Sequence, residues 1–91
     1  MLIVKATSQF RKDYKLAKKR GLDPVLLETV IDALLTETPL DAKHRDHALS
    51  GEYAGFRECH ILPNWLLIYY ISKGTLILTA SRTGTHSDLF G

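Results

Sequence analysis

The chain has 91 residues, of which 45% are hydrophobic and 24% are charged, and its formal net charge at pH 7 is +2. This composition is typical of one small globular domain, residues 1–91, and excludes an intrinsically disordered chain. No apolar run is long enough to cross a bilayer, and Cys59 is the only cysteine, which excludes an internal disulfide. We therefore expect a cytoplasmic protein that has no membrane partner.

The N-terminal segment predicts a strand followed by a helix. Residues 2–5 are rich in β-branched side chains, which favour a strand. Thr7 or Ser8 can cap the next helix through its hydroxyl, and Gly21 suits the left-handed conformation that ends a helix. One face of this helix carries apolar residues at helical spacing, namely Phe10, Tyr14 and Ala17.

Charge is distributed unevenly over the first half of the chain. Between residues 5 and 20 seven basic residues accompany a single acid, Asp13, whereas residues 21–42 contain five acids and no lysine or arginine. The basic side chains form either a solvated helix face or a surface that binds phosphates. As candidates for RNA binding we take Arg11, Lys12, Lys15, Lys18 and Lys19.

A second helix is predicted from Asp23-Pro24 to Thr38-Pro39. Aspartate is a favoured N-cap, and proline is favoured at the first helical position. Adjacent apolar pairs recur at helical spacing and form a face broad enough to pack on a sheet. The polar segment that continues to Asp46 is predicted to be a loop.

The remainder predicts consecutive strands at 47–51, 56–62, 65–71 and 75–81, with a turn at 72–74 and a break at 83–85. The run from Trp65 is almost continuously apolar, as in a central strand buried on both faces. The order of elements indicates an α+β domain, in which both helices pack on one face of a mostly antiparallel sheet.

Several proton-transferring side chains fall on or beside these strands. Alternation places Glu58 and His60 on one face of their strand, His47 begins the neighbouring strand, and Arg82 and His86 follow the last one. Histidine suits removal of a proton from an RNA 2′-OH and protonation of the leaving 5′ oxygen, and arginine suits stabilisation of the phosphate. The set therefore predicts RNA cleavage without a metal ion or another cofactor.

Other interpretations of these residues are structural. The pair His44 and His47 has metal-ligand spacing, but few carboxylates or thiols accompany it, so we do not expect a zinc site. Cys59 points to the face opposite His60 and is favoured as a small buried residue rather than a nucleophile. Trp65 and Phe56 are favoured as core, although an exposed aromatic ring can stack on a base.

Four segments together resemble the YafQ branch of the RelE/ParE toxin superfamily: Asp46–Gly51, Phe56–Ile61, Pro63–Tyr69 and Arg82–Phe90. The resemblance implies a RelE-like fold with two N-terminal helices on a four- to five-stranded sheet. It also implies a bacterial type II toxin that cuts mRNA in the ribosomal A site. The implied partners are the 70S ribosome, mRNA, a DinJ-like antitoxin of the ribbon-helix-helix type and, through the complex with that antitoxin, operator DNA.

The resemblance also implies roles for particular residues. Matched by position, the family's functional residues correspond to His47, His60, Arg82, His86 and Phe90. The family commonly has an aspartate at the position of Asn64, beside Trp65, and we hypothesise that Glu58 supplies the missing carboxylate.

Two other functions remain open from the sequence. One is a catalytically weak member of the fold that binds an antitoxin or RNA, which the asparagine at position 64 favours. The other is a ParE-like gyrase inhibitor, which has no need of several histidines in one site.

Overall fold

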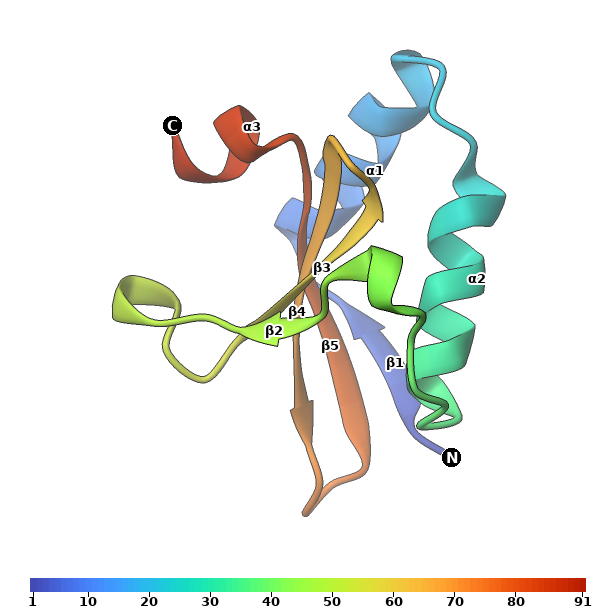
Figure 1. Ribbon diagram of the computed structural model, residues 1–91, viewed down its shortest axis with the longest axis vertical. Helices are drawn as coiled ribbons and strands as arrows, with labels where there is room; N and C mark the ends of the chain where they lie inside the picture. Colours follow the sequence, from blue (N-terminus) through green and yellow to red (C-terminus); the bar gives the residue numbers. More distant parts are fainter.

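The computed structural model describes residues 1–91 and has one layer of two helices against a five-stranded sheet (Figure 1). The elements, in chain order, are β1 (Ile3–Ala6), α1 (Ser8–Lys19), α2 (Pro24–Leu35), the 3₁₀ turn η1 (Ala42–His44), β2 (His47–Ala48), the 3₁₀ turn η2 (Gly51–Tyr53), β3 (Arg57–Leu62), β4 (Trp65–Ser72), β5 (Ile77–Gly84) and α3 (His86–Phe90).

Both predicted helix starts are confirmed. The Thr7 hydroxyl accepts a hydrogen bond from the Phe10 N–H at 3.0 Å, and the Asp23 carboxylate accepts one from the Val25 N–H at 3.0 Å. Each bond satisfies a first-turn donor that has no partner within the helix. The two helices therefore begin where the capping residues place them.

The strand order is β1-β5-β4-β3-β2, with β1 parallel to β5 and every other pair antiparallel. The predicted α+β class, with two helices on one face of a mostly antiparallel sheet, is confirmed. In Figure 1 the N-terminal strand lies beside the last strand, so the first and last parts of the chain pair within one sheet.

Two expectations for the C-terminal segment are wrong. The last strand does not end before Thr83 but continues through Gly84, so Arg82 lies inside β5. Beyond the end of β1, Thr7 and Asp13 take over the free edge of β5: Thr7 N–H donates to Ala80 O at 3.1 Å, and Thr83 N–H donates to the Asp13 carboxylate at 3.2 Å. Because these edge groups are satisfied, the strand continues.

The second correction is the short helix α3, in a segment where no helix was predicted. Thr85 and Asp88 form a reciprocal capping box: Asp88 N–H donates to the Thr85 hydroxyl at 3.1 Å, and Thr85 N–H donates to the Asp88 carboxylate at 2.9 Å. Strand β2 is shorter than predicted, at two residues.

The two faces of the sheet have different cores. The larger core lies between the sheet and the two long helices, and it includes Leu27, Trp65 and Tyr69, each 1% exposed. The other face carries a small core, in which Leu89 of α3 packs against Leu66 and Ile68 of β4. This second face is otherwise free to carry polar groups.

The helices are too short or too polar for any of them to span a membrane.

Cys59 lies in the larger core and is fully buried. Burial raises the pKa of its thiol to about 12, and the nearby carboxylates of Asp46 and Glu58 add to that increase. The thiol is therefore neutral at physiological pH and is a poor nucleophile. The prediction that Cys59 is a small buried residue is confirmed.

Candidate functional site

The carboxylate of Glu58 lies between two histidines. Glu58 pairs with His47 across β2 and β3, and His60 follows two residues later on the same face. The Nε2 atom of His47 is 3.6 Å from Glu58 Oε1, and the Nε2 atom of His60 is 3.5 Å from the same oxygen. Glu58 is 6% exposed, so its charge acts on the rings where water screens it poorly.

Backbone carbonyls orient both rings. His47 Nδ1 is 2.6 Å from Arg45 O, and His60 Nδ1 is 3.3 Å from Pro63 O. Because a carbonyl can only accept, Nδ1 is the donor in each contact. The neutral form of each ring therefore has a proton-free Nε2, and the protonated form presents an Nε2–H to Glu58. Each Nε2 is suited to taking up and releasing a proton beside a fixed negative charge.

A single cross-strand row joins this cluster to Arg82. His47 lies opposite Glu58, Glu58 opposite Ile68, and Ile68 opposite Arg82. Residues opposite each other on neighbouring strands share a face of the sheet, and three strand spacings amount to about 14 Å. The structure thus brings three of the four predicted catalytic residues to one face, with the histidines at one end of the row and the arginine at the other.

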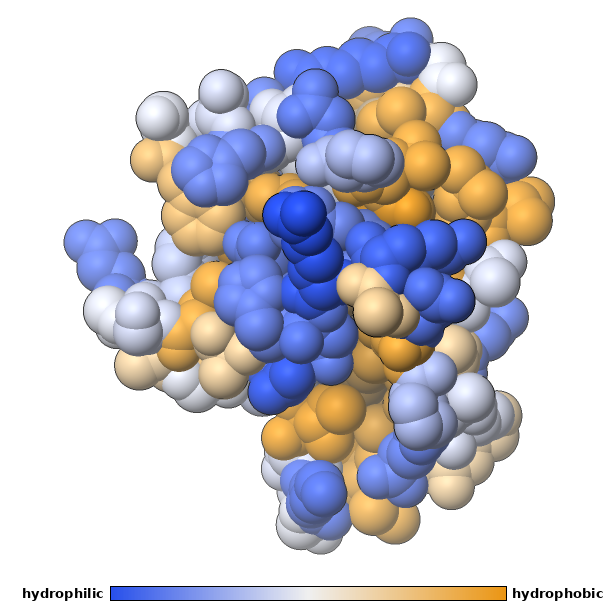
Figure 2. Space-filling model, in the orientation of Figure 1, coloured by the Kyte–Doolittle hydropathy of each residue, from blue (hydrophilic) through white to orange (hydrophobic).

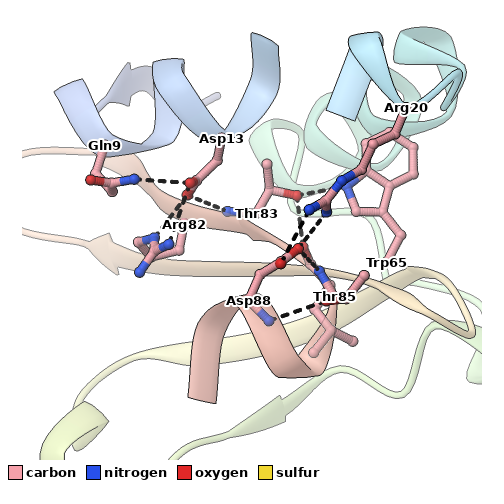
Figure 3. A network of polar contacts seen from close by, with 9 residues as sticks. Gln9, Asp13, Arg20, Trp65, Arg82, Thr83, Thr85 and Asp88 are labelled. Atoms are coloured by element: carbon pink, nitrogen blue, oxygen red, sulfur yellow. Dashed lines mark hydrogen bonds and ion pairs between the residues drawn. The ribbon is translucent and has the colours of Figure 1, made fainter. Parts of the chain in front are cut away.

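Asp13 holds the Arg82 guanidinium in place (Figure 3). Arg82 Nε donates to Asp13 Oδ2 at 2.8 Å and Nη2 donates to Oδ1 at 3.3 Å. The Gln9 amide also donates to Asp13, at 3.0 Å. This hydrogen bonding to Asp13 raises the Arg82 pKa, so the group is a permanent cation, and its Nη1 is outside the pairing. Asp13, which the sequence pattern did not single out, is the residue that positions Arg82.

His86 opens α3 beside a run of aromatic rings. Its ring lies 4.8 Å from that of Phe90, which makes an edge contact with Tyr53 at 5.5 Å. Tyr53 in turn meets Phe56 at 5.9 Å, and Phe56 meets Tyr70 at 5.0 Å. Phe90 therefore supports His86 and connects it to the aromatic side chains that cover the small core. His86 itself is exposed and free to meet a substrate.

An ion pair fastens α3 to the end of α1. Arg20 Nη1 lies 2.6 Å from Asp88 Oδ2, the same carboxylate that caps α3 (Figure 3). Gly84 lies directly beneath it, where an added Cβ would come within 3.0 Å of Asp88 Oδ2. The orientation of His86 therefore depends on Arg20 and Asp88.

Asp88 is expected to make the stability of the protein depend on pH in the acid range. Its bond to Arg20, with the Thr85 N–H, holds its pKa well below the usual value. The stabilisation is therefore complete above about pH 4, where the unfolded aspartate is ionised, and is lost as the pH falls toward the folded pKa. We expect Asp88→Asn to lower the free energy of unfolding at pH 7 by about 1 kcal/mol, as for a lost helix cap.

Chemical denaturation of both proteins from pH 7 to pH 2 checks this expectation. The difference between them should shrink as the solution is acidified. Asp32→Asn, at an exposed position of α2, is the control. A difference between wild type and Asp88→Asn that stays constant over this pH range would contradict the role given to Asp88.

Asn64 lies in the turn between β3 and β4, and Trp65 begins β4. Asn64 lines a cavity of about 430 Å³ together with Asp13, Arg20 and Arg82, so it lies near the guanidinium of Arg82. Trp65 is buried on the helix side of the sheet, where its indole N–H donates to the Thr83 hydroxyl at 2.9 Å. The prediction that Trp65 belongs to the core is therefore confirmed, and its side chain lies next to the Arg82 strand.

The basic residues predicted to bind RNA all project from α1. Arg11, Lys12, Lys15, Lys18 and Lys19 are exposed, while Asp13 and Ala17 between them are buried. Arg20 differs, because it pairs with Asp88. The structure thus presents five cations along one helix, which is compatible with either interpretation of the basic stretch.

His44 binds the backbone of β3. Its Nδ1 donates to His60 O at 2.6 Å, which ties η1 to β3. No group of three or more His, Cys, Asp or Glu side chains is placed to hold one metal ion. His44 therefore has a structural partner, and its spacing to His47 does not create a pair of convergent ligands.

Comparison with known proteins identifies relatives along nearly the whole chain. The family model described as the bacterial toxin of type II toxin–antitoxin systems, YafQ, matches residues 2–91. Over 89 residues the chain is 40% identical to the mRNA interferase toxin YafQ of Escherichia coli strain K12, covering 97% of this chain and 95% of that protein.

Solved structures agree with these matches. A metal-bound toxin from Helicobacter pylori has a TM-score of 0.94 and 44% identity, with 99% of this chain and 100% of that chain covered. YafQ in the E. coli DinJ–YafQ complex has a TM-score of 0.90 and 38% identity, with both chains fully covered. Since sequence and fold agree from end to end, the chain belongs to the YafQ family of bacterial toxins of type II toxin–antitoxin systems.

Proposed function

We propose that this protein is an mRNA endoribonuclease that cleaves in the ribosomal A site and thereby inhibits translation. The observation that carries the proposal is the Glu58 carboxylate shared by His47 and His60, on a face that also holds Arg82. The E. coli relative is named an mRNA interferase, which supports the same substrate class.

The proposed reaction begins with the 2′-OH of the RNA itself. Nε2 of His60 or His47 takes the 2′-OH proton, and the 2′ oxygen attacks the adjacent phosphorus. Glu58 stabilises the imidazolium that forms, because its buried charge lies 3.5–3.6 Å from both Nε2 atoms. In this proposal the Glu58 carboxylate takes the electrostatic role that the aspartate at the position of Asn64 has in the family.

Arg82 and His86 complete the reaction. The guanidinium, held by Asp13, donates to the phosphoryl oxygens as negative charge develops on them. Protonated His86 gives its proton to the leaving 5′ oxygen, and the P–O5′ bond breaks. The products are a 2′,3′-cyclic phosphate, which water can open to a 3′-phosphate, and a 5′-OH. The proposed chemistry needs neither a metal ion nor another cofactor.

His86→Ala is expected to lower the rate of cleavage at least about tenfold, because the leaving oxygen loses its proton donor. Ser87→Ala, at the next exposed position of α3, is the matched control and should cleave like the wild type. Single-turnover cleavage of mRNA on purified ribosomes measures both. Equal rates for wild type and His86→Ala would remove His86 from the role of general acid.

The basic face of α1 is proposed to hold ribosomal RNA. Reversing Lys12, Lys15 and Lys19 to glutamate is expected to weaken ribosome binding and to make the remaining affinity less dependent on salt, because fewer phosphates are neutralised and fewer counterions are released. Ribosome affinity measured over a range of salt from about 50 to about 200 mM checks both effects. A large loss of affinity with an unchanged salt dependence would contradict the phosphate contacts.

The partner proposed for the free toxin is a DinJ-like antitoxin. The E. coli relative is solved in complex with DinJ, and this chain covers that YafQ completely. An acidic antitoxin segment that orders on binding would complement the basic face of α1. We further propose that the complex binds operator DNA through a ribbon-helix-helix antitoxin and that the toxin acts in the cytoplasm.

Expression without the antitoxin, followed by mapping of mRNA ends, separates this function from the two alternatives. Cuts in phase with codons on translated mRNA support the proposal. Growth arrest with intact mRNA and damaged DNA would indicate a gyrase inhibitor. Continued growth, with the protein present and folded, would indicate a member that lacks efficient cleavage.

A further inference from the structure

A small hollow of about 290 Å³ lies beside His60, between η1 and the turn that follows β3. Its lining consists of Lys43, Arg45, His60 and Pro63, so three of the four residues are basic. No acidic side chain lines it. Figure 2 shows strongly hydrophilic residues gathered across the middle of the face on which η1 and β2 lie in front. The mechanism described above uses His60 but neither Lys43 nor Arg45.

The two cations are presented by a turn with a fixed backbone. The Asp41 carboxylate caps η1 by accepting from Lys43 N–H at 3.0 Å. Arg45 ends the turn in the left-handed conformation, at φ 46° and ψ 44°, which is unfavourable for a residue with a Cβ. His44 Nδ1 donates to His60 O at 2.6 Å and so binds the turn to β3. Lys43 and Arg45 flank the anchored His44 in the chain and are therefore held beside His60.

The carboxylates of Asp46 and Glu58 do not line the hollow, and each has partners of its own. The Asp46 carboxylate accepts from the Tyr69 hydroxyl at 2.5 Å and from Arg57 at 3.1 Å. Glu58 faces the Nε2 atoms of the two histidines. Concentrated positive charge with polar donors attracts an anion with several acceptor oxygens, and phosphate fits this description.

We infer that this hollow binds a backbone phosphate of the RNA strand, next to the phosphate that is cleaved. The inference rests on the proposed function. Lys43 and Arg45 precede the edge strand β2, whereas Arg82 lies on β5, two strand spacings or about 10 Å beyond β3. A strand of RNA that crosses this face therefore meets cations on both sides of His60. The hollow fixes the strand through its backbone and reads no base.

Binding of a short single-stranded RNA, with every 2′-OH methylated to prevent cleavage, tests the hollow. We expect the double variant Lys43→Ser/Arg45→Ser to bind at least tenfold more weakly than the wild type. The slope of its log affinity against log salt concentration should be shallower than the wild-type slope by about 0.7, as expected for one lost phosphate contact. The control Lys5→Ser/Lys73→Ser removes the same charge from exposed positions of β1 and the β4–β5 turn. Equal weakening in both variants would overturn the inference.

A scan with one neutral methylphosphonate linkage locates the contact. With the wild type, the neutral linkage should weaken RNA binding most at one position. With Lys43→Ser/Arg45→Ser, a neutral linkage at that position should not weaken RNA binding any further. If the loss caused by the double variant and the loss caused by the neutral linkage were additive at every position of the RNA, the assignment would be overturned. Inorganic phosphate, followed through the NMR signals of the His60 ring, should bind the wild type and not the double variant. A polyglutamate peptide that displaces the RNA and binds more tightly would instead assign the hollow to a protein partner.

Failure of this inference is distinguishable from failure of the proposed function. Wild-type cleavage of mRNA on ribosomes, combined with equal RNA affinities in the two double variants, rejects the hollow alone. Selective loss of RNA affinity in Lys43→Ser/Arg45→Ser, combined with no cleavage by the wild type, supports the phosphate contact and rejects the nuclease.

Discussion

Glu58→Gln is expected to lower mRNA cleavage by about 10²- to 10⁴-fold, the range that general acid–base groups contribute. Glutamine keeps the size of the side chain but removes the negative charge that faces Nε2 of both His47 and His60. The imidazolium formed when either ring takes the 2′-OH proton then has no buried counter-charge. The loss should appear mainly in the rate of the chemical step, because ribosome binding is assigned to α1.

Glu52→Gln, in the exposed turn η2, is the matched control and should retain full activity. Single-turnover rates on pre-bound ribosomes, measured across pH for wild type and Glu58→Gln, separate chemistry from binding. His47→Ala and His60→Ala, each combined with Glu58→Gln, identify the base: the loss for the true base and the loss for Glu58 should not add. A wild-type rate for folded Glu58→Gln would contradict the shared-carboxylate mechanism.

Arg82→Ala is expected to lower cleavage by about 10²- to 10³-fold, comparable to removal of one donor that stabilises transition-state charge. Arg82→Lys keeps a positive charge but loses the fork that pairs with Asp13 through Nε and Nη2, so we expect an intermediate rate. The same single-turnover assay measures both, and the order wild type, Arg82→Lys, Arg82→Ala is the expected result.

Asp13→Asn provides a second test of the same arginine. It keeps the shape of the side chain but replaces the carboxylate, whose Oδ2 accepts from Arg82 Nε–H and Thr83 N–H, with an uncharged amide. We expect slower cleavage with unchanged ribosome affinity, because Asp13 is buried and does not belong to the exposed basic face. If Arg82→Ala reduced ribosome affinity and left the rate on bound ribosomes unchanged, Arg82 would be a binding residue and not a stabiliser of the reacting phosphate.

Local signals were sufficient for most of the fold. The caps at Thr7 and Asp23 and the apolar spacing of the helices act within one or two turns, so the sequence shows them directly. The grouping of Glu58 and His60 also follows from alternation along a single strand. Alternation alone does not predict the pairing of Glu58 with His47, because that pairing depends on β2 and β3 being neighbours in the sheet.

The remaining parts of the site depend on contacts between distant segments. Asp13 pairs with Arg82 across 69 positions of the chain, and Arg20 pairs with Asp88 across 68. One signal for Asp13 was present: it lies three residues after Phe10 and four before Ala17, on the apolar stripe of α1, where an unpartnered acid would be costly. The Thr85-x-x-Asp88 spacing was likewise a capping signal for α3.

The extent of β5 had no comparable local signal. Thr83-Gly84-Thr85 is typical of a strand end, yet the strand continues because Asp13 and Thr7 satisfy its free edge. The burial of Trp65 was predicted from its apolar strand, but the partner of its indole N–H was not, because that partner, Thr83, lies on the neighbouring strand.

The chemical groups on the cut RNA ends test the central claim most directly. Purified protein acting on ribosome-bound mRNA should leave a 2′,3′-cyclic phosphate or 3′-phosphate on one fragment and a 5′-OH on the other. These ends follow from attack by the RNA's own 2′-OH, and their yield should fall in Glu58→Gln, Arg82→Ala and His86→Ala. Fragments that carry a 3′-OH and a 5′-phosphate would contradict the account, because they require attack by water in place of the 2′-OH.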